Sequence, residues 1–314
     1  MDYFSAVLNQ VIIFLMIIVV GFIVVKIKAV PTSILPSISI IFAKIVVPAI
    51  LFFNTVNGST REDMVETIFL LGIVLVLFAV IIIVMRIMPK VLKLEGNRGK
   101  LFPVLFSFGN VGFVGIPLLI TMFGQRAMVF VTMYAIVDQL TLWTYGYSQT
   151  FPVDNRLKFT PKTLFRLINP PIIAVVLSVI LIFLGVRVPD IINRAFSSVA
   201  DAGMALPFIY IGGMLATMTD LKYLKSLDIY VGMLVKMLVF PISIFMLLTS
   251  FGIPLDMAMA TTILFGLPSM PIVPMLAGTN NSDEKYATAT VLITTVASLL
   301  TLTFVTFFMT VVFV

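Results

Sequence analysis

Cysteine and histidine are absent from this 314-residue sequence, and charged residues make up only 11% of it. Without thiols or imidazoles the chain has no thiol nucleophile, disulfide, zinc site, histidine-ligated haem or Ser-His-Asp triad. Soluble proteins carry about 25% charged residues and about 45–50% apolar ones, whereas here 61% are apolar. The 20 basic and 14 acidic side chains are too few to cover a water-facing surface, so the composition excludes an ordinary soluble globule.

Apolar runs interrupted by proline, glycine or charge repeat along the whole chain, and each is close to the roughly 20 residues that cross a bilayer. The first run is too long for a signal peptide, and its basic residues Lys26 and Lys28 follow it instead of preceding it. We therefore expect an all-α polytopic membrane protein with ten spans. The predicted spans are 4–28, 33–57, 65–89, 101–124, 127–150, 164–186, 190–217, 226–252, 255–278 and 286–313.

Basic residues are distributed unevenly between the two predicted sides of the membrane. Four follow even-numbered spans, namely Arg61, Arg126, Arg187 and Arg194. Fourteen follow odd-numbered spans: Lys26, Lys28, Arg86, Lys90, Lys93, Arg98, Lys100, Arg156, Lys158, Lys162, Arg166, Lys222, Lys225 and Lys285. This asymmetry predicts that the second group is cytoplasmic and that both termini are extracytoplasmic. We interpret the basic loops as orientation signals and expect no nucleic-acid partner.

The two halves of the chain contain related segments. Residues 108–117 (FGNVGFVGIP) align with 265–274 (FGLPSMPIVP) at an offset of 157 residues, and Pro48 aligns with Pro207 at 159. Five spans is an odd number, so similar halves must cross the membrane in opposite directions. We expect one five-span repeat in 1–150, a cytoplasmic link in 151–163 and an inverted five-span repeat in 164–314.

Spans four and nine are predicted to be broken within the membrane, because they concentrate glycine and proline. Gly112 and Pro117 lie in the first, and Pro274 in the second. Broken helices in a bilayer expose backbone N–H and C=O groups and persist only around protein or a water-filled cavity. The two breaks therefore predict a small polar site for an ion or a carboxylate, lined also by Asn110 and Ser269.

Four ionisable residues fall inside the predicted spans, where a charge costs on the order of 3 kcal/mol. They are Lys44, Asp138, Asp201 and Lys236. Asp138 and Lys236 are the strongest functional candidates, and we hypothesise that they form a charge-coupling pair. Lys44 either reaches the interface or serves as a second anion partner. Polar neighbours place Asp201 in an outer vestibule, and Trp143 is interpreted as an interfacial anchor.

Several segments in this order resemble the auxin efflux carrier family of secondary transporters, in its bacterial and archaeal permease branch. They are 108–119 (FGNVGFVGIPLL), 167–186 (LINPPIIAVVLSVILIFLGV), 44–52 (KIVVPAILF), 204–215 (MALPFIYIGGML), 265–276 (FGLPSMPIVPML) and 286–304 (YATATVLITTVASLLTLTF).

The resemblance implies a ten-helix inverted repeat whose broken helices cross at Pro117 and Pro274, with an organic anion bound beside the crossing. It also implies an elevator movement of spans three to five and eight to ten against a scaffold of spans one, two, six and seven, through which the protein dimerises. The family's first asparagine corresponds to Asn110. The position of a second asparagine in plant carriers is occupied by Leu267, which disfavours auxin as the substrate.

We therefore expect a non-enzymatic transporter of a small organic anion such as a malate-like carboxylate, in the cell membrane, with no cofactor other than a coupling H⁺ or Na⁺. Two alternatives remain open from the sequence. One is a cation/proton antiporter on the same scaffold, with Asp138 and Asp201 as ion ligands. The other is a membrane sensor that binds a ligand and transports nothing.

Overall fold

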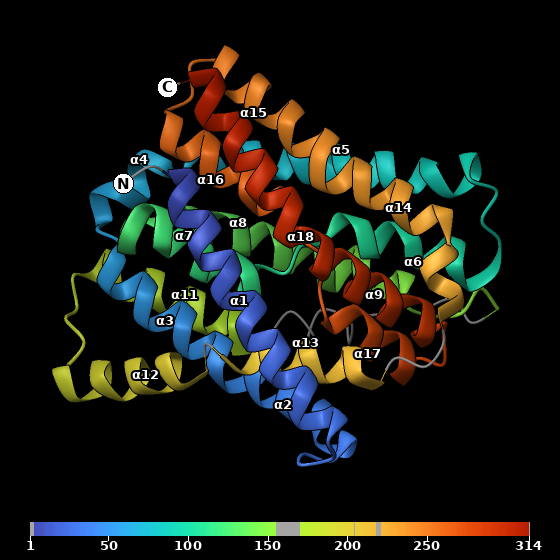
Figure 1. The fold of residues 1–314 in the computed structure, drawn as a ribbon. Helices are drawn as coiled ribbons and strands as arrows, with labels where there is room; N and C mark the ends of the chain where they lie inside the picture. Colours follow the sequence, from blue (N-terminus) through green and yellow to red (C-terminus); the bar gives the residue numbers. More distant parts are fainter. Residues whose placement is uncertain (1–2, 155–169, 204, 218–220, 314) are drawn as a thin grey trace.

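The computed structural model describes residues 3–154, 170–203, 205–217 and 221–313. Most of the predicted link 151–163 lies outside the described residues, together with four of the basic residues assigned to the cytoplasmic side: Arg156, Lys158, Lys162 and Arg166. The described part is helical throughout (Figure 1), apart from turns and one isolated backbone bridge. The all-α fold expected from the sequence is thus confirmed for these residues.

The first half of the chain forms α1 to α9. These helices and their helical turns are α1 (Tyr3–Lys26), the 3₁₀ turn η1 (Thr32–Ile34), α2 (Leu35–Ile41), the π-helical turn η2 (Phe42–Val46), α3 (Val47–Gly58), α4 (Arg61–Thr67), α5 (Phe69–Val91), α6 (Gly96–Ser107), the π-helical turn η3 (Val111–Gly115), α7 (Ile116–Phe123), the 3₁₀ turn η4 (Gly124–Arg126), α8 (Ala127–Thr141), the π-helical turn η5 (Leu142–Gly146) and α9 (Tyr147–Gln149).

The second half forms α11 to α18. They are α11 (Pro170–Leu184), α12 (Asp190–Gly203), α13 (Leu206–Thr217), the 3₁₀ turn η7 (Leu221–Lys225), α14 (Leu227–Leu234), the π-helical turn η8 (Val235–Val239), α15 (Phe240–Ser250), α16 (Leu255–Gly266), α17 (Ile272–Thr279) and α18 (Glu284–Phe313).

Six helical stretches among the described residues are long and apolar enough to cross a membrane. They are Leu8–Lys26, Phe69–Val91, Val111–Gln149, Asp190–Thr217, Leu227–Ser250 and Glu284–Val311. Three shorter apolar helices are Lys44–Gly58, Pro170–Leu184 and Leu255–Gly266. The chain is therefore a polytopic membrane protein.

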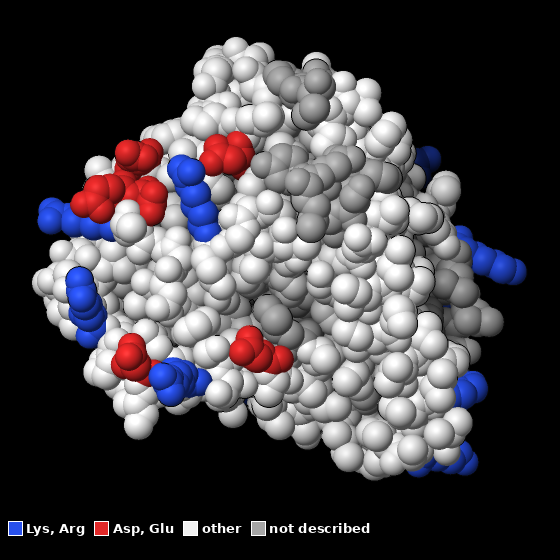
Figure 2. All heavy atoms as spheres, turned by 60° about the vertical axis from the view of Figure 1, so that its left-hand side comes forward, with Lys and Arg blue, Asp and Glu red and all other residues white. Residues whose placement is uncertain are grey.

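Charged side chains are concentrated in two regions of the face drawn in Figure 2. Acidic and basic groups lie together on the left half of this view, whereas its right-hand edge carries only lysine and arginine. The described residues drawn between these two regions are mainly uncharged, as expected for a surface that faces lipid.

Helices distant in sequence pack closely. The most extensive contact joins α1 to α13, and α1 crosses obliquely in Figure 1. A β-carbon at Gly212 of α13 would collide with the backbone carbonyl of Ile18 in α1, and one at Gly21 of α1 with the carbonyl of Ile209. Glycine thus lets the two backbones touch, as is common between membrane helices.

Three of the π-helical turns are explained by a proline that follows two residues after the turn ends. These prolines are Pro48 after η2, Pro117 after η3 and Pro241 after η8. Proline has no N–H to bond the carbonyl four residues earlier. The residue before each proline instead bonds the carbonyl five residues back, as when Val47 N donates to Phe42 O. Lys44 and Lys236 both lie in such widened turns.

Candidate functional site

Two broken helices cross in the buried centre of the molecule. Helix α6 ends at Ser107 and α16 ends at Gly266, and the extended segments that follow them pair antiparallel. A backbone bridge joins Gly109 to Ser269, and Asn110 N donates to Pro268 O at 2.8 Å. Both breaks predicted from glycine and proline are therefore present, and each satisfies backbone groups of the other.

The crossing depends on glycine at two positions of the first broken helix. A β-carbon at Gly109 would lie 3.0 Å from Cβ of Leu267, and one at Gly115 would lie 2.7 Å from Cδ1 of the same leucine. Leu267, at the position of the plant carriers' second asparagine, is fully buried. It therefore acts as a packing residue between the two segments.

Two buried polar groups at the crossing have no hydrogen-bond partner within the described residues. Asn110 accepts the Phe113 N–H at 3.2 Å through Oδ1, while its Nδ2 is unpaired. The Ser269 N–H donates to Thr294 Oγ1 at 3.1 Å, while the Ser269 hydroxyl is unpaired. An unpaired buried polar atom costs about 1–3 kcal/mol, so such atoms at a helix break indicate a place for a ligand or water.

A cavity of about 270 Å³ lies beside the crossing. Lys44, Asn110, Gly112 and Asp138, all predicted from the sequence, line it. The remaining lining is mainly apolar and comes from Ile40, Val47, Leu51, Val111, Phe113, Ile116, Ala135, Gln139, Leu142, Trp143, Pro170, Pro171, Met270, Pro271, Ile272 and Met275. A few polar groups in an apolar cavity are typical of small-molecule sites.

Asp138 is held by a hydrogen-bonded chain of two residues that follow it, one in α8 and one in η5. Its Oδ2 accepts from Gln139 Nε2 at 2.9 Å, and Gln139 Oε1 in turn accepts from Trp143 Nε1 at 3.3 Å. Trp143 was expected at the membrane interface, but it lines the cavity, where its indole N–H orients Gln139. Asp138 Oδ1 is buried and has no partner among the described residues.

Lys236 is fully buried in η8 and does not line the cavity. Its Nζ has no hydrogen-bond partner in the described part of the chain, and no ion pair within 4.0 Å joins it to Asp138. The two charges are nevertheless close enough to interact electrostatically. They form no direct ion pair.

The remaining predicted site residues lie outside the cavity. Pro117 is buried in the first turn of α7, and Pro274 lies in α17 against a separate cavity of about 10 Å³. The family resemblance placed the crossing at these prolines, but the paired backbone is at 109–110 and 268–269, because the prolines start or continue the second half-helices. Asp201 is exposed on α12 and accepts from Ser197 Oγ at 3.2 Å.

One family comparison matches nearly the whole chain. The family model described as membrane transport protein matches residues 6–306. The chain belongs to this membrane transport protein family. The resemblance to auxin efflux carriers is thereby confirmed, and no curated protein matches the chain.

Most residues that line the cavity of this membrane transport protein are not recognisable as site residues from the sequence, among them Gln139, Met270 and Pro170. Gln139 is adjacent to Asp138, and its position beside a membrane carboxylate was the available signal. Met270 and Pro170 had no such signal, because an apolar residue before a break or at the start of a span is ordinary in membrane helices. Only the crossing and the packing of α11 bring them to the cavity.

Proposed function

We propose that this membrane transport protein is a secondary transporter of a small organic anion, a monocarboxylate or a malate-like dicarboxylate, which binds in the 270 Å³ cavity. The unpaired Nδ2 of Asn110 is the observation that carries this proposal. A carboxylate oxygen accepts such a donor, and the helix that begins at Val111 presents its positive end at the same place. Lys44 supplies positive charge from the opposite wall.

The cavity lies where two sets of helices meet, which supports an elevator movement. Ile40, Lys44, Val47, Leu51, Pro170 and Pro171 come from the proposed scaffold of α1–α3 and α11–α13, and the other lining residues come from the proposed mobile part of α5–α9 and α14–α18. A buried side-chain hydrogen bond between Thr55 and Thr132 hydroxyls, at 3.0 Å, crosses the same boundary. A substrate held mainly by Asn110 on the mobile side would move past Lys44.

An inverted repeat of 1–150 and 164–314 is part of the proposal, and the packing pattern supports it. The contact of α1 with α13 has its counterpart in that of α11 with α3, the contact of α5 with α6 in that of α15 with α16, and the contact of α7 with α8 in that of α17 with α18. The offset of 157 residues relates Gly109 to Gly266 and Ser269 to Gly112. The pair of positions 112 and 266 has the same antiparallel register as the bridged pair 109 and 269, as an inverted repeat requires. Ten spans, extracytoplasmic termini, a location in the cell membrane and dimerisation through the scaffold complete the proposal.

Asp138 provides a means of coupling transport to protons. An ionised Asp138 in the cavity repels a carboxylate substrate, so substrate entry favours the protonated form. Lys236 is fully buried, has no hydrogen-bond or ion-pair partner among the described residues, and supplies the opposite charge. We propose that the pair alternates between anion-bound, proton-bound and empty states during transport, with H⁺ as the coupling ion.

The substrate site is tested with Asn110→Ala in proteoliposomes, with uptake measured for a panel of mono- and dicarboxylates. Loss of the charge-assisted hydrogen bond should weaken binding by about tenfold to a hundredfold, with thermal stability close to that of the unmodified protein. Asn57→Ala is the matched control, because Asn57 is an exposed asparagine of α3 outside the cavity. Equal affinity in the Asn110 variant would refute the site, and ligand binding without flux would indicate a sensor.

The coupling role is tested with Asp138→Asn, for which flux should become independent of a pH step across the liposome membrane. Asp201→Asn removes an exposed carboxylate and should leave the pH profile unchanged. A pH profile of Asp138→Asn that superimposes on the unmodified profile would make Asp138 structural. Flux that follows a sodium step and ignores the pH step would favour the cation antiporter.

A further inference from the structure

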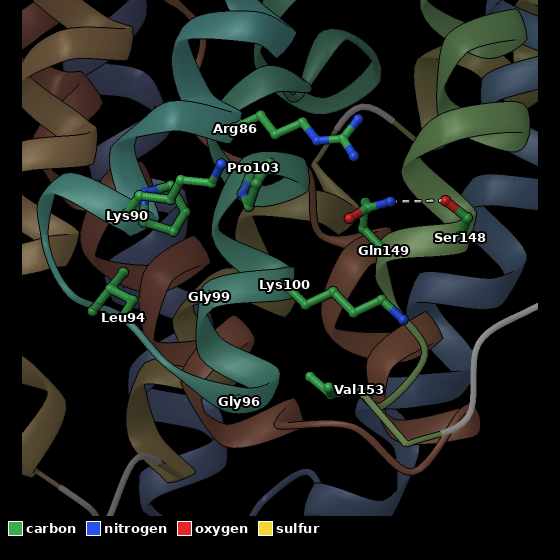
Figure 3. A pocket seen from close by; sticks show the side chains of 11 residues that line it. Arg86, Lys90, Leu94, Gly96, Gly99, Lys100, Pro103, Ser148, Gln149 and Val153 are labelled. Atoms are coloured by element: carbon green, nitrogen blue, oxygen red, sulfur yellow. Dashed lines mark hydrogen bonds between the residues drawn. The ribbon is translucent and has the colours of Figure 1, made fainter.

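A second, larger cavity of about 520 Å³ lies where the C-terminal end of α5 meets the start of α6. It is formed by the last turns of α5, the first turns of α6 and the end of α9. Arg86 and Lys90 of α5 and Lys100 of α6 line it, together with Ser148 and Gln149 of α9. Figure 3 shows Arg86, Lys100 and Gln149 extending into the same space between these elements.

The charged side chains that line this cavity are all basic. No aspartate or glutamate is among its lining residues. Arg86 and Lys90 are four residues apart on one helix, where like charges destabilise each other. Neither has a carboxylate within 4.0 Å among the described residues. Lys100 donates to Pro152 O at 3.2 Å, which holds its ammonium group at the cavity.

Membrane orientation alone does not account for this arrangement, because basic residues orient a span wherever they lie along its loop. Here three cations from two helices converge on a concave surface. The hydroxyl of Tyr145, in the turn η5 that leads into α9, is also buried and has no hydrogen-bond partner within the described residues. An anion with several acceptor oxygens would offset the mutual repulsion and use these donors.

The exposed face of α5 indicates where that anion comes from. Leu75, Ala79 and Ile83 form an exposed apolar stripe, and the same helical spacing continues into Arg86 and Lys90. The opposite face, with residues such as Phe78 and Ile81, is fully buried. An acyl chain lying along the stripe would therefore bring its headgroup to the basic cavity.

We propose that this cavity binds the phosphate headgroup of an anionic phospholipid of the inner leaflet, whose acyl chain lies along α5. The site connects the hairpin of α5 and α6 with α9, and α6 leads directly into the first broken segment. A bound headgroup would therefore stabilise the first half of the crossing.

The test compares phosphatidylglycerol with phosphatidylcholine in mixed micelles of the purified full-length protein. Lipid retention is measured by native mass spectrometry and stability by thermal unfolding. The variant Arg86→Gln/Lys90→Gln/Lys100→Gln removes the three charges of the cavity. The control Lys26→Gln/Lys28→Gln/Lys225→Gln removes three exposed charges that lie outside it.

Phosphatidylglycerol should raise the unfolding temperature of the unmodified protein and of the control, and apparent affinity for it should fall about tenfold to a hundredfold in the cavity variant. Salt should weaken retention in the unmodified protein. Equal loss in the control would overturn the proposal, because binding would then follow net charge. Competition by millimolar glycerol phosphate or inorganic phosphate would also overturn it, in favour of a soluble phosphate compound. Neither readout depends on the transported substrate.

Discussion

Removing the hydroxyl of Tyr286 should destabilise the protein by a predictable amount. Tyr286, in the first turn of α18, donates to Asp228 Oδ2 of α14 at 2.6 Å. Tyr286 is fully buried and Asp228 is 9% exposed. The guanidinium of Arg98, from α6, lies 5.5 Å from the centre of the Tyr286 ring. The hydroxyl therefore links α14 and α18 at a point where α6 also contributes a charge.

The magnitude follows from the charge on the acceptor. A hydrogen bond to an ionised group is worth about 1.5–3 kcal/mol, and Tyr286→Phe leaves the Asp228 carboxylate without this donor. An unfolding entropy of about 2.1 cal/mol/K per residue over 314 residues is about 0.66 kcal/mol/K. A loss of about 2 kcal/mol therefore lowers the unfolding temperature by about 3 °C.

Thermal unfolding in detergent, followed by intrinsic fluorescence, measures this loss, and Tyr223→Phe is the matched control. Tyr223 belongs to the same cluster, but its hydroxyl is 3.5 Å from Asp283 Oδ1, at the limit of a hydrogen bond. Its removal should lower the unfolding temperature by less than about 1 °C. Equal effects of the two substitutions would show that ring packing, not the Tyr286 hydroxyl, stabilises the cluster. An unchanged unfolding temperature in Tyr286→Phe would refute the hydrogen-bond argument directly.

Two other contacts lead to predictions outside the cavity. Gly212→Ala should separate α13 from α1, because its β-carbon meets the carbonyl of Ile18. The substitution should lower the free energy of unfolding in detergent by about 1–3 kcal/mol. Gly72→Ala is the control, because open space surrounds Gly72, and it should be neutral or stabilising. Thr60→Ala should cost about 1 kcal/mol at neutral pH, because Thr60 N and Oγ1 both donate to the Asp63 carboxylate at the start of α4. These bonds hold the pKa of Asp63 below its ordinary value, so their contribution is complete above about pH 4 and is lost as the pH falls through the lowered pKa. The stability difference between Thr60→Ala and the unmodified protein should therefore shrink in acid, and a difference that grows there would contradict this sign.

The sequence by itself determined the class of protein and the approximate places of its unusual residues. Composition and run length depend only on local residues, and they sufficed to predict a helical membrane protein with breaks within residues 108–117 and 265–274. Charge inside an apolar run is equally local, so Asp138, Lys44 and Lys236 were recognisable without a fold. The motif from Phe108 to Pro117 indicated the family for the same reason.

Only the tertiary structure decided which of these residues meet. The pairing of Gly109 with Ser269 joins positions far apart in the chain, and hydropathy carries no information about such a register. The packing of α3 and α11 against α8 places Lys44 at the cavity that Asp138 and Trp143 also line. Lys236 has equally apolar neighbours in the sequence, but it is fully buried and does not line the cavity. Neighbouring residues in the sequence determine where a side chain lies in its helix. The cavity that the side chain faces is determined by helices from distant parts of the chain.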